Sequence, residues 1–259
     1  LCLHKVPRHL KVCRLLKGIG IIMIRFIFVV LFVVLFLILS TPLMLVEWII
    51  GKFNPGLKDR SSLAIVNWAF RWVIRLSGTK VIATDTAVLY VGNHRSFFDV
   101  VLTYVRVPRP TGYIAKKEMV KWPLLNIWMK DLHCLFLDRQ DIKAGLKTIL
   151  QAIEKAKNGI SICIFPEGTR NKTQDTFLPF HEGSFKIAEK ANVPIIPMTI
   201  VNSAAVFEDH FPKIKKATVV IEYGKPIYPK ELDKETRKSM GTYVQNIISE
   251  TYFKNKELI

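Results

Sequence analysis

The apolar residues of this 259-residue chain follow two patterns that meet near residue 78. Before that point, one long and nearly uninterrupted apolar run predominates. After it, short apolar runs bounded by turn residues alternate with longer segments in which apolar residues recur every three or four positions. Short bounded runs are typical of buried strands, and the longer spacing is typical of amphipathic helices. We therefore expect an N-terminal helical segment followed by an α/β domain over residues 78–259.

Six short runs predict strands in this domain, and four periodic segments predict helices. Strands that alternate with helices form a largely parallel sheet, so the predicted fold class is α/β, with a mostly parallel sheet flanked by helices. The predicted strands are residues 87–91, 113–115, 134–137, 161–165, 195–200 and 218–223, and the predicted helices are residues 100–105, 142–158, 184–191 and 234–253.

The N-terminal apolar run is long enough to cross a lipid bilayer. Residues 26–46 carry no charged side chain, and a helix of that length extends over about 30 Å. A second helix is expected over residues 61–76, where Trp and Arg occur in one amphipathic segment, as in helices at a lipid interface. We therefore predict a membrane-embedded two-helix segment over residues 23–77. The alternative, in which the helices pack only against protein, fits the second helix better than the first.

Two arrangements of this segment are open: the first helix spans the bilayer, or both helices dip into one leaflet as a hairpin. The basic N-terminal flank favours a cytoplasmic N-terminus. A cytoplasmic α/β domain then requires the hairpin, and we expect a membrane protein with its catalytic domain on the cytoplasmic face. The first methionine is Met23, so residues 1–22 are expected to be an upstream extension, which the intact mass of natively expressed protein would test.

The chain is strongly basic, with a formal net charge of +17. Such a charge suits anionic partners: nucleic acid, anionic lipid or a phosphorylated substrate. The sequence contains no nucleic-acid-binding motif, and its basic residues do not interleave with aromatic ones as they do in RNA-binding sheets. We therefore expect a membrane lipid surface as partner and no nucleic acid.

The cysteines predict neither a disulfide framework nor a metal centre. The chain has four of them and no Cys-x-x-Cys pair, which is typical of reduced, cytosol-facing proteins. His133 and Cys134 are adjacent, but no second pair of ligands stands at the spacing of a zinc site. We expect no metal.

A His–Asp pair at the end of the first predicted strand is the main candidate for chemistry. His94 and Asp99 are five residues apart, which places them on different faces of a regular helix. They can meet if His94 lies in the loop, Ser96 caps the helix and Asp99 occupies its third position, as in a capping box. A carboxylate on one imidazole nitrogen leaves the other nitrogen as a base. The alternative is that His94 only satisfies a buried turn and Asp99 only caps a helix.

The chain offers no nucleophile of its own beside this pair. It contains no Gly-x-Ser-x-Gly elbow, the turn that presents a nucleophilic serine in α/β-hydrolases. A His–Asp pair without a serine indicates that the activated hydroxyl belongs to a substrate.

Cationic side chains follow three further predicted strands. Lys116 follows residues 113–115, Arg139 follows residues 134–137, and Arg170 closes the segment Phe-Pro-Glu-Gly-Thr-Arg over residues 165–170. Each could be an ordinary exposed charge. Together with the His–Asp pair they predict a phosphate pocket, because Arg presents a planar fork of donors to phosphate oxygens.

Four segments, in this order, resemble the four sequence blocks of the 1-acyl-sn-glycerol-3-phosphate acyltransferase family. They are Asn-His-Arg-Ser-Phe-Phe-Asp (93–99), Leu-Phe-Leu-Asp-Arg (135–139), Phe-Pro-Glu-Gly-Thr-Arg (165–170) and Val-Pro-Ile-Ile-Pro (193–197). The resemblance covers roughly residues 78 to 225. It implies a glycerolphosphate acyltransferase-like fold and the transfer of a fatty acyl group from a thioester to a glycerophosphate hydroxyl.

The resemblance also implies roles for individual residues. His94 would be the general base and Asp99 would orient it, and Glu167 could position the acceptor. In one departure, His181 stands where the family usually has Lys, so the charge there would be only partial near neutral pH. The residues assigned to the acceptor phosphate are Lys116, Arg139, Glu167, Gly168, Thr169 and Arg170.

The expected reaction is acylation of the sn-2 hydroxyl of 1-acyl-sn-glycerol 3-phosphate to phosphatidic acid in phospholipid synthesis. The co-substrate is acyl-CoA or acyl carrier protein, and no cofactor is expected. Two alternatives remain: the same chemistry on glycerol 3-phosphate or another lysophospholipid, and a membrane-bound lipid-binding protein without turnover. The His–Asp pair argues against the second, because binding alone needs no base.

Overall fold

The computed structural model describes the backbone of residues 8–77, 80–84, 88–173 and 175–259, and side chains from residue 23 onward outside 78–87 and residue 174. A seven-stranded sheet forms its centre, in the order β1-β7-β6-β2-β5-β3-β4. Every neighbouring pair is parallel except β6 and β7, which confirms the predicted mostly parallel sheet. The strands are β1 Lys80–Thr84, β2 Leu89–Gly92, β3 Thr111–Lys116, β4 Leu135–Leu137, β5 Ser161–Ile164, β6 Ile195–Val201 and β7 Thr218–Tyr223.

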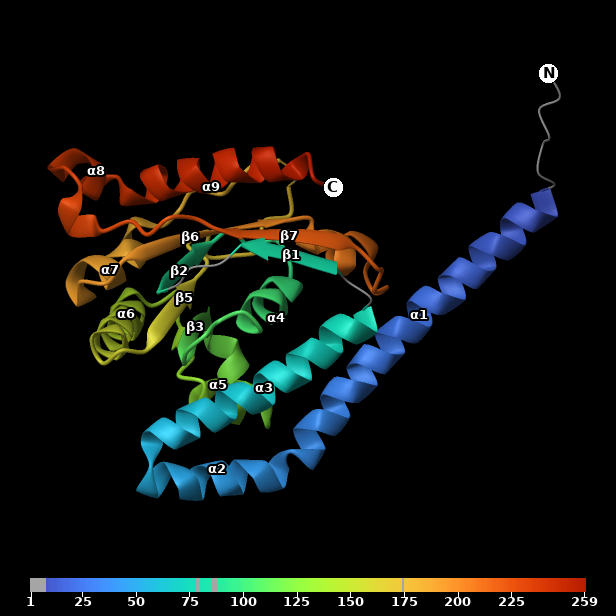
Figure 1. Cartoon of the computed structure of the whole chain (residues 1–259), viewed down its shortest axis with the longest axis horizontal. Helices are drawn as coiled ribbons and strands as arrows, with labels where there is room; N and C mark the ends of the chain where they lie inside the picture. The colour runs from blue at the N-terminus through green and yellow to red at the C-terminus, as the bar shows by residue number, and fades with distance from the viewer. Residues whose placement is uncertain (1–7, 78–79, 85–87, 174) are drawn as a thin grey trace.

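Helices cover both faces of the sheet (Figure 1), and the strands are apolar on both sides for that reason. Side chains such as Tyr90, Cys163 and Ile196 pack toward α3 and α4. Their strand neighbours Val91 and Ile162 pack toward α6, α7 and α9. The helices of the domain are α4 Phe98–Tyr104, α5 Leu125–Asp131, α6 Ile142–Lys157, α7 Lys186–Ala191, α8 Lys234–Lys238 and α9 Met240–Lys256.

Three features of the α/β domain differ from the sequence prediction. The edge strand β1, which pairs with the distant β7, and the short helix α5 were not predicted. The helix expected over residues 234–253 is two helices, because the backbone leaves helical geometry at Ser239.

The prediction of two N-terminal helices was wrong, because the described chain forms three. These are α1 Arg8–Leu39, α2 Thr41–Phe53 and α3 Pro55–Ser77. The first break lies at Ser40, where Pro42 in the first turn of α2 has no N–H to continue the preceding helix. Asn54 and Pro55 form the second break.

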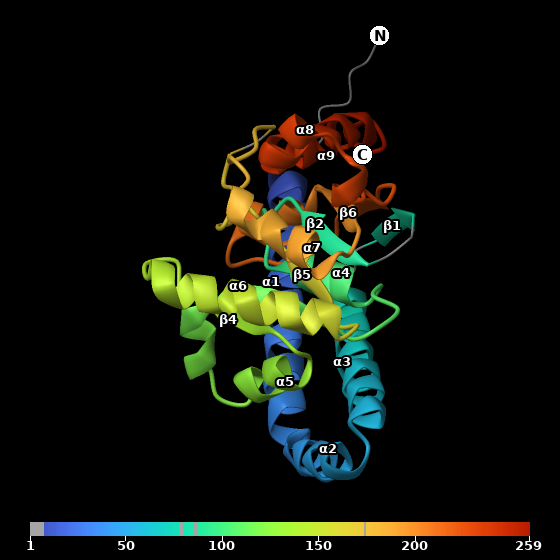
Figure 2. The ribbon, with the colours of Figure 1, turned by 90° about the vertical axis from the view of Figure 1, so that its left-hand side faces the viewer.

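The apolar character of α1 and α2 is shared across the first break. Taken singly, no helix in the described part of the chain has the length and apolar character of a membrane span. The segments Met23–Leu39 and Thr41–Phe53 together have the length and apolar character of a span, with a bend of 49° between the two helices. Figures 1 and 2 show α2 at the opposite end of the molecule from α9, with α3 running back to the sheet.

Polar contacts hold α3 to its neighbours. The buried Glu47 carboxylate on α2 accepts hydrogen bonds from the hydroxyls of Ser61 and Ser62. Asp59, in the same part of α3, accepts from Nε2 of His133 at 2.8 Å. Burial lowers the pKa of the His133 imidazole, so the contact holds a largely uncharged ring.

The His133 contact predicts a pH dependence of stability. A histidine whose pKa is lower in the folded than in the unfolded protein binds fewer protons when folded, so stability falls as pH drops through the ordinary value of about 6.5. His133→Asn removes this titration, and Asn tolerates the positive φ of 60° there. We expect the free energy of unfolding, measured by denaturant at pH 7.5 and 5.5, to fall more for the wild type than for His133→Asn. Equal decreases in both proteins would contradict this account.

Candidate active site

The strand order gathers the predicted site residues at one edge of the sheet. Strands β2, β5, β3 and β4 are consecutive neighbours and all parallel, so their carboxyl ends meet at the same edge. The loop after β2 and the loop after β5 are therefore neighbours. Ligands in open α/β sheets bind at this edge. The loops and strand ends at this edge carry, in the order of the strands, His94, Arg170, Lys116 and Arg139.

The predicted contact between His94 and Asp99 is confirmed. Nδ1 of His94 lies 2.8 Å from Oδ2 of Asp99, whose side chain is fully buried. The same oxygen accepts the backbone N–H groups of Arg95 and Ser96, and the Ser96 hydroxyl accepts from the N–H of Phe98 at the start of α4. These bonds are similar to those of a capping box, but α4 begins at Phe98 with Phe97 as its N-cap, so Asp99 occupies the second helical position and not the expected third. The carboxylate is thus held in place by the helix start and not by the imidazole alone.

The imidazole plane of His94 is fixed by an aromatic neighbour. Phe165, directly after β5, stacks on the His94 ring at a centroid distance of 4.3 Å and an interplanar angle of 15°. Nε2 of His94 has no hydrogen-bond partner among the described residues, and the side chain is 18% exposed. With the Nδ1 proton directed at Asp99, Nε2 presents a lone pair to an accessible space, as a general base requires.

Glu167 supports the His94 loop. One carboxylate oxygen accepts the backbone N–H of His94 at 2.8 Å, and the other accepts the N–H of Leu178 at 3.1 Å. The residue is only 4% exposed, and this burial raises the pKa of its carboxyl group. Both oxygens are used by these backbone bonds. The geometry therefore favours a positioning role for Glu167 over the direct acceptor contact expected from the sequence.

The next two residues shape the loop after Glu167. Gly168 has a φ of 71°, and a Cβ atom there would lie 3.1 Å from Nε2 of His181, so both the conformation and the space favour glycine. Thr169 is exposed. His181, the departure from the family pattern, thus lies beside this loop.

Arg170 is held over the start of α4. Its guanidinium lies 3.7 Å from the centroid of the Phe97 ring, and Nη1 is 3.0 Å from Oε1 of Glu208. The same Glu208 oxygen accepts the backbone N–H of Phe97 at 2.7 Å. Glu208 therefore ties Arg170 to the His94 loop. The sequence analysis missed Glu208, because no local motif marks a residue whose partners lie 38 and 111 positions away.

Lys116 and Arg139 extend the cationic edge. Both are exposed, and neither has an ion-pair partner among the described residues. Their neighbours Lys117 and Asp138 pair with each other at 2.7 Å instead. Lys116 and Arg139 thus remain available to a ligand. The described residues contain no group of three or more His, Cys, Asp or Glu side chains that could hold a metal ion.

The known proteins that this chain resembles are acyltransferases. The family model described as Acyltransferase matches residues 73–201. A probable 1-acyl-sn-glycerol-3-phosphate acyltransferase from Mycoplasma pneumoniae is 30% identical over 196 residues, which cover 68% of this chain and 73% of that protein. A 1-acyl-sn-glycerol-3-phosphate acyltransferase from Cocos nucifera is 28% identical over 79% of this chain and 65% of its own length. The Helicobacter pylori protein of that name is 38% identical over 49% of this chain and 54% of its own length.

The chain thus spans less than two thirds of the length of the Cocos nucifera and Helicobacter pylori relatives. A solved structure covers more. The crystal structure of the 1-acyl-sn-glycerophosphate (LPA) acyltransferase PlsC from Thermotoga maritima superposes with a TM-score of 0.77, over 91% of this chain and 96% of that one, at 21% identity. This similarity confirms the predicted fold.

Proposed function

Because this chain belongs to the 1-acyl-sn-glycerol-3-phosphate acyltransferase family, we propose that it acylates the sn-2 hydroxyl of 1-acyl-sn-glycerol 3-phosphate to give phosphatidic acid. The acyl group comes from a thioester, acyl-CoA or acyl carrier protein, and the product enters phospholipid synthesis. The observation that carries the proposal is the His94–Asp99 contact, which leaves Nε2 of His94 without a partner among the described residues, at the sheet edge that also carries Arg170.

The geometry supports a direct transfer. Nε2 of His94 removes the proton of the acceptor hydroxyl as its oxygen attacks the thioester carbonyl. The tetrahedral intermediate then expels the thiolate, which takes the proton back from the imidazolium. Asp99, 2.8 Å from Nδ1, stabilises the imidazolium between these steps. The thioester is already activated, so no covalent enzyme intermediate is required.

The cationic edge supports a phosphate-bearing acceptor. Arg170 is fixed by Phe97 and Glu208, and fixing a donor fork in advance reduces the entropy lost on binding. Lys116 and Arg139 provide two cations at the ends of neighbouring strands, and neither has an ion-pair partner within the described parts of the chain. Binding the phosphate at this edge would hold the sn-2 hydroxyl near His94, and such positioning is a large part of catalysis with two bound substrates.

The N-terminal helices support a membrane location with the α/β domain on its cytoplasmic face. Apolar side chains on α1 and α2 are exposed over a long surface, including Phe28 at 55%, Trp48 at 56% and Phe53 at 84%. An apolar surface of this kind marks a membrane or protein contact. Helix α3 returns from α2 to the sheet (Figure 1). If the helices form a hairpin that dips into one leaflet, the α/β domain therefore lies on the same side of the membrane as the N-terminus.

Arg170→Lys is expected to weaken acceptor binding. Lysine keeps the positive charge but cannot stack on Phe97 or present a planar fork of donors. A hydrogen bond to a charged group contributes about 1.5–3 kcal/mol, so KM for lysophosphatidic acid should rise about tenfold or more with a smaller change in kcat. Steady-state kinetics with varied acceptor measures this. A fall in kcat at constant KM would argue against phosphate binding by Arg170.

Product analysis with three acceptors tests the proposed substrate. The full-length protein in detergent would be supplied with acyl-CoA and either lysophosphatidic acid, glycerol 3-phosphate or lysophosphatidylcholine, and the lipids resolved by mass spectrometry. We expect phosphatidic acid from the first as the main product. A preference for another acceptor would keep the chemistry and replace the substrate, whereas no product with any acceptor would favour a lipid-binding protein without turnover.

A further inference from the structure

A basic pocket opens at the end of the sheet opposite the His94 edge. It has a volume of about 630 Å³, which is in the range of small-ligand sites. It lies where β3 and β5 begin, since Pro110 and Gly159 come directly before those strands. Helix α3 forms the facing wall with Arg60, Leu63, Asn67 and Arg71, and Arg109 joins Pro110 on the other side.

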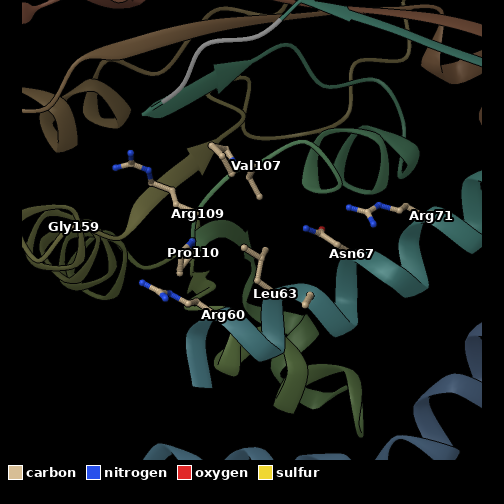
Figure 3. Close-up of a pocket in the computed structure, with 10 residues that line it drawn as sticks. Arg60, Leu63, Asn67, Arg71, Val107, Arg109, Pro110 and Gly159 are labelled. Atoms are coloured by element: carbon tan, nitrogen blue, oxygen red, sulfur yellow. The ribbon is translucent and has the colours of Figure 1, made fainter. Parts of the chain in front are cut away.

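Three arginines line this pocket without a counter-charge. In Figure 3, the guanidinium groups of Arg60 and Arg109 lie on one side of the pocket and that of Arg71 on the other. No acidic residue lines the pocket, and none of the three arginines forms an ion pair within the part of the chain that the structure describes. Arg170 at the catalytic edge, by contrast, is paired with Glu208. Guanidinium groups on both sides of a pocket that has no acidic residue in its lining attract anions, and a phosphate group matches their donors.

A buried amide at the pocket wall also lacks its partner. Asn67 is 7% exposed, and its Oδ1 atom has no hydrogen-bond partner among the residues that the structure describes. Buried polar side chains are nearly always hydrogen-bonded. Since Asn67 lines the pocket beside Arg71 (Figure 3), a ligand that carries hydroxyl groups as well as negative charge would satisfy both the amide and the arginines.

The position of the pocket on α3 indicates where such a ligand comes from. Trp68 and Trp72, on the adjoining strip of the same helix, are 52% and 36% exposed, and Trp68 contacts Phe32 and Phe36 of the apolar helix α1. Exposed tryptophans next to an apolar helical surface are typical of the level at which lipid headgroups lie. Arg60 and Arg71 would then face the headgroups from α3.

We propose that this pocket binds the phosphate of an anionic lipid headgroup, at a site separate from the catalytic edge. A headgroup held there docks the α/β domain against the bilayer with α3 at the headgroup level. The proposal rests on the pocket and the membrane location, and it does not depend on which reaction the His94 edge performs.

Vesicle binding by the full chain tests this site without any turnover. Wild-type protein, the double variant Arg60→Gln/Arg109→Gln and a charge-matched control, Lys143→Gln/Lys147→Gln, would be sedimented with phosphatidylcholine vesicles with and without phosphatidic acid. Lys143 and Lys147 are exposed on α6, outside the pocket. A second arm adds inorganic phosphate and follows the thermal unfolding midpoint, because a ligand that binds only the folded state raises it.

We expect phosphatidic acid to strengthen wild-type and control binding equally and the pocket variant to lose about tenfold or more of that gain, because each basic residue near an anionic surface contributes a several-fold factor. Equal losses in the pocket variant and the control would show diffuse charge and overturn the proposal. An effect of inorganic phosphate without any effect of phosphatidic acid would overturn the lipid assignment. The readout is binding, so failure of acyl transfer leaves this result unaffected.

Discussion

His94→Ala is expected to lower the rate of acyl transfer by about 10²–10⁴-fold, the contribution of a positioned general base. The variant removes the only group in the described site that combines an accessible lone pair with a fixed orientation. The orientation of the His94 imidazole comes from its 2.8 Å contact with Asp99 and from the stack on Phe165. The residual rate would come from the bound geometry of the two substrates. Initial rates at saturating acceptor, with circular dichroism as a check on folding, measure the effect.

The fold should tolerate this change. The capping bonds from the backbone N–H groups of Arg95 and Ser96 to Asp99 do not involve the imidazole, and the His94 backbone N–H still donates to Glu167. A folded His94→Ala protein with near-normal turnover would exclude His94 as the base.

Asp99→Asn is expected to lower kcat by at least about 10²-fold and to change KM for the acceptor little. An asparagine can place its carbonyl oxygen where Oδ2 accepts the three N–H groups, and its NH₂ where Oδ1 has no partner among the described residues. The local structure is therefore preserved, but the buried negative charge that stabilises the imidazolium is lost. Loss of one charged hydrogen bond of about 3 kcal/mol corresponds to a factor of about 10² in rate.

A matched substitution separates this effect from a general loss of carboxylates. Asp233 caps α8 through its side chain and is remote in sequence from His94 and Asp99. Asn caps a helix as well as Asp does. Asp233→Asn should retain wild-type kcat. If Asp99→Asn raised KM and left kcat unchanged, Asp99 would belong to acceptor binding instead of to the base.

The His–Asp contact could be predicted from the sequence because it is local. Five residues, a capping serine and the end of an apolar strand determine where the Asp99 carboxylate can reach, and the structure has this geometry. The strand segments were also predictable, because apolar runs bounded by turns are short-range signals. The strand order was not, since it depends on how helices pack on the two faces.

Contacts between distant segments account for what the sequence did not show. Glu208 reaches Arg170 and Phe97 only after β6 has been placed beside β2. Glu167 was expected at the acceptor, yet its oxygens bind the backbones of two loops that meet only in the fold. The helix break at Ser40 lies inside the apolar run over residues 26–46, so hydropathy alone does not indicate it. Pro42, in the first turn of α2, is the residue that predicts a break there. The pocket of Arg60 and Arg109 combines residues from α3 and the loop before β3.

The most direct test of the account is thiol release from an acyl thioester by the detergent-purified protein. It would be measured with and without lysophosphatidic acid, for the wild type and for His94→Ala. We predict rapid release that requires both lysophosphatidic acid and His94, with one phosphatidic acid formed per thiol released. Release at the same rate without an acceptor, or from the folded His94→Ala protein, would contradict the proposal that His94 activates the acceptor hydroxyl.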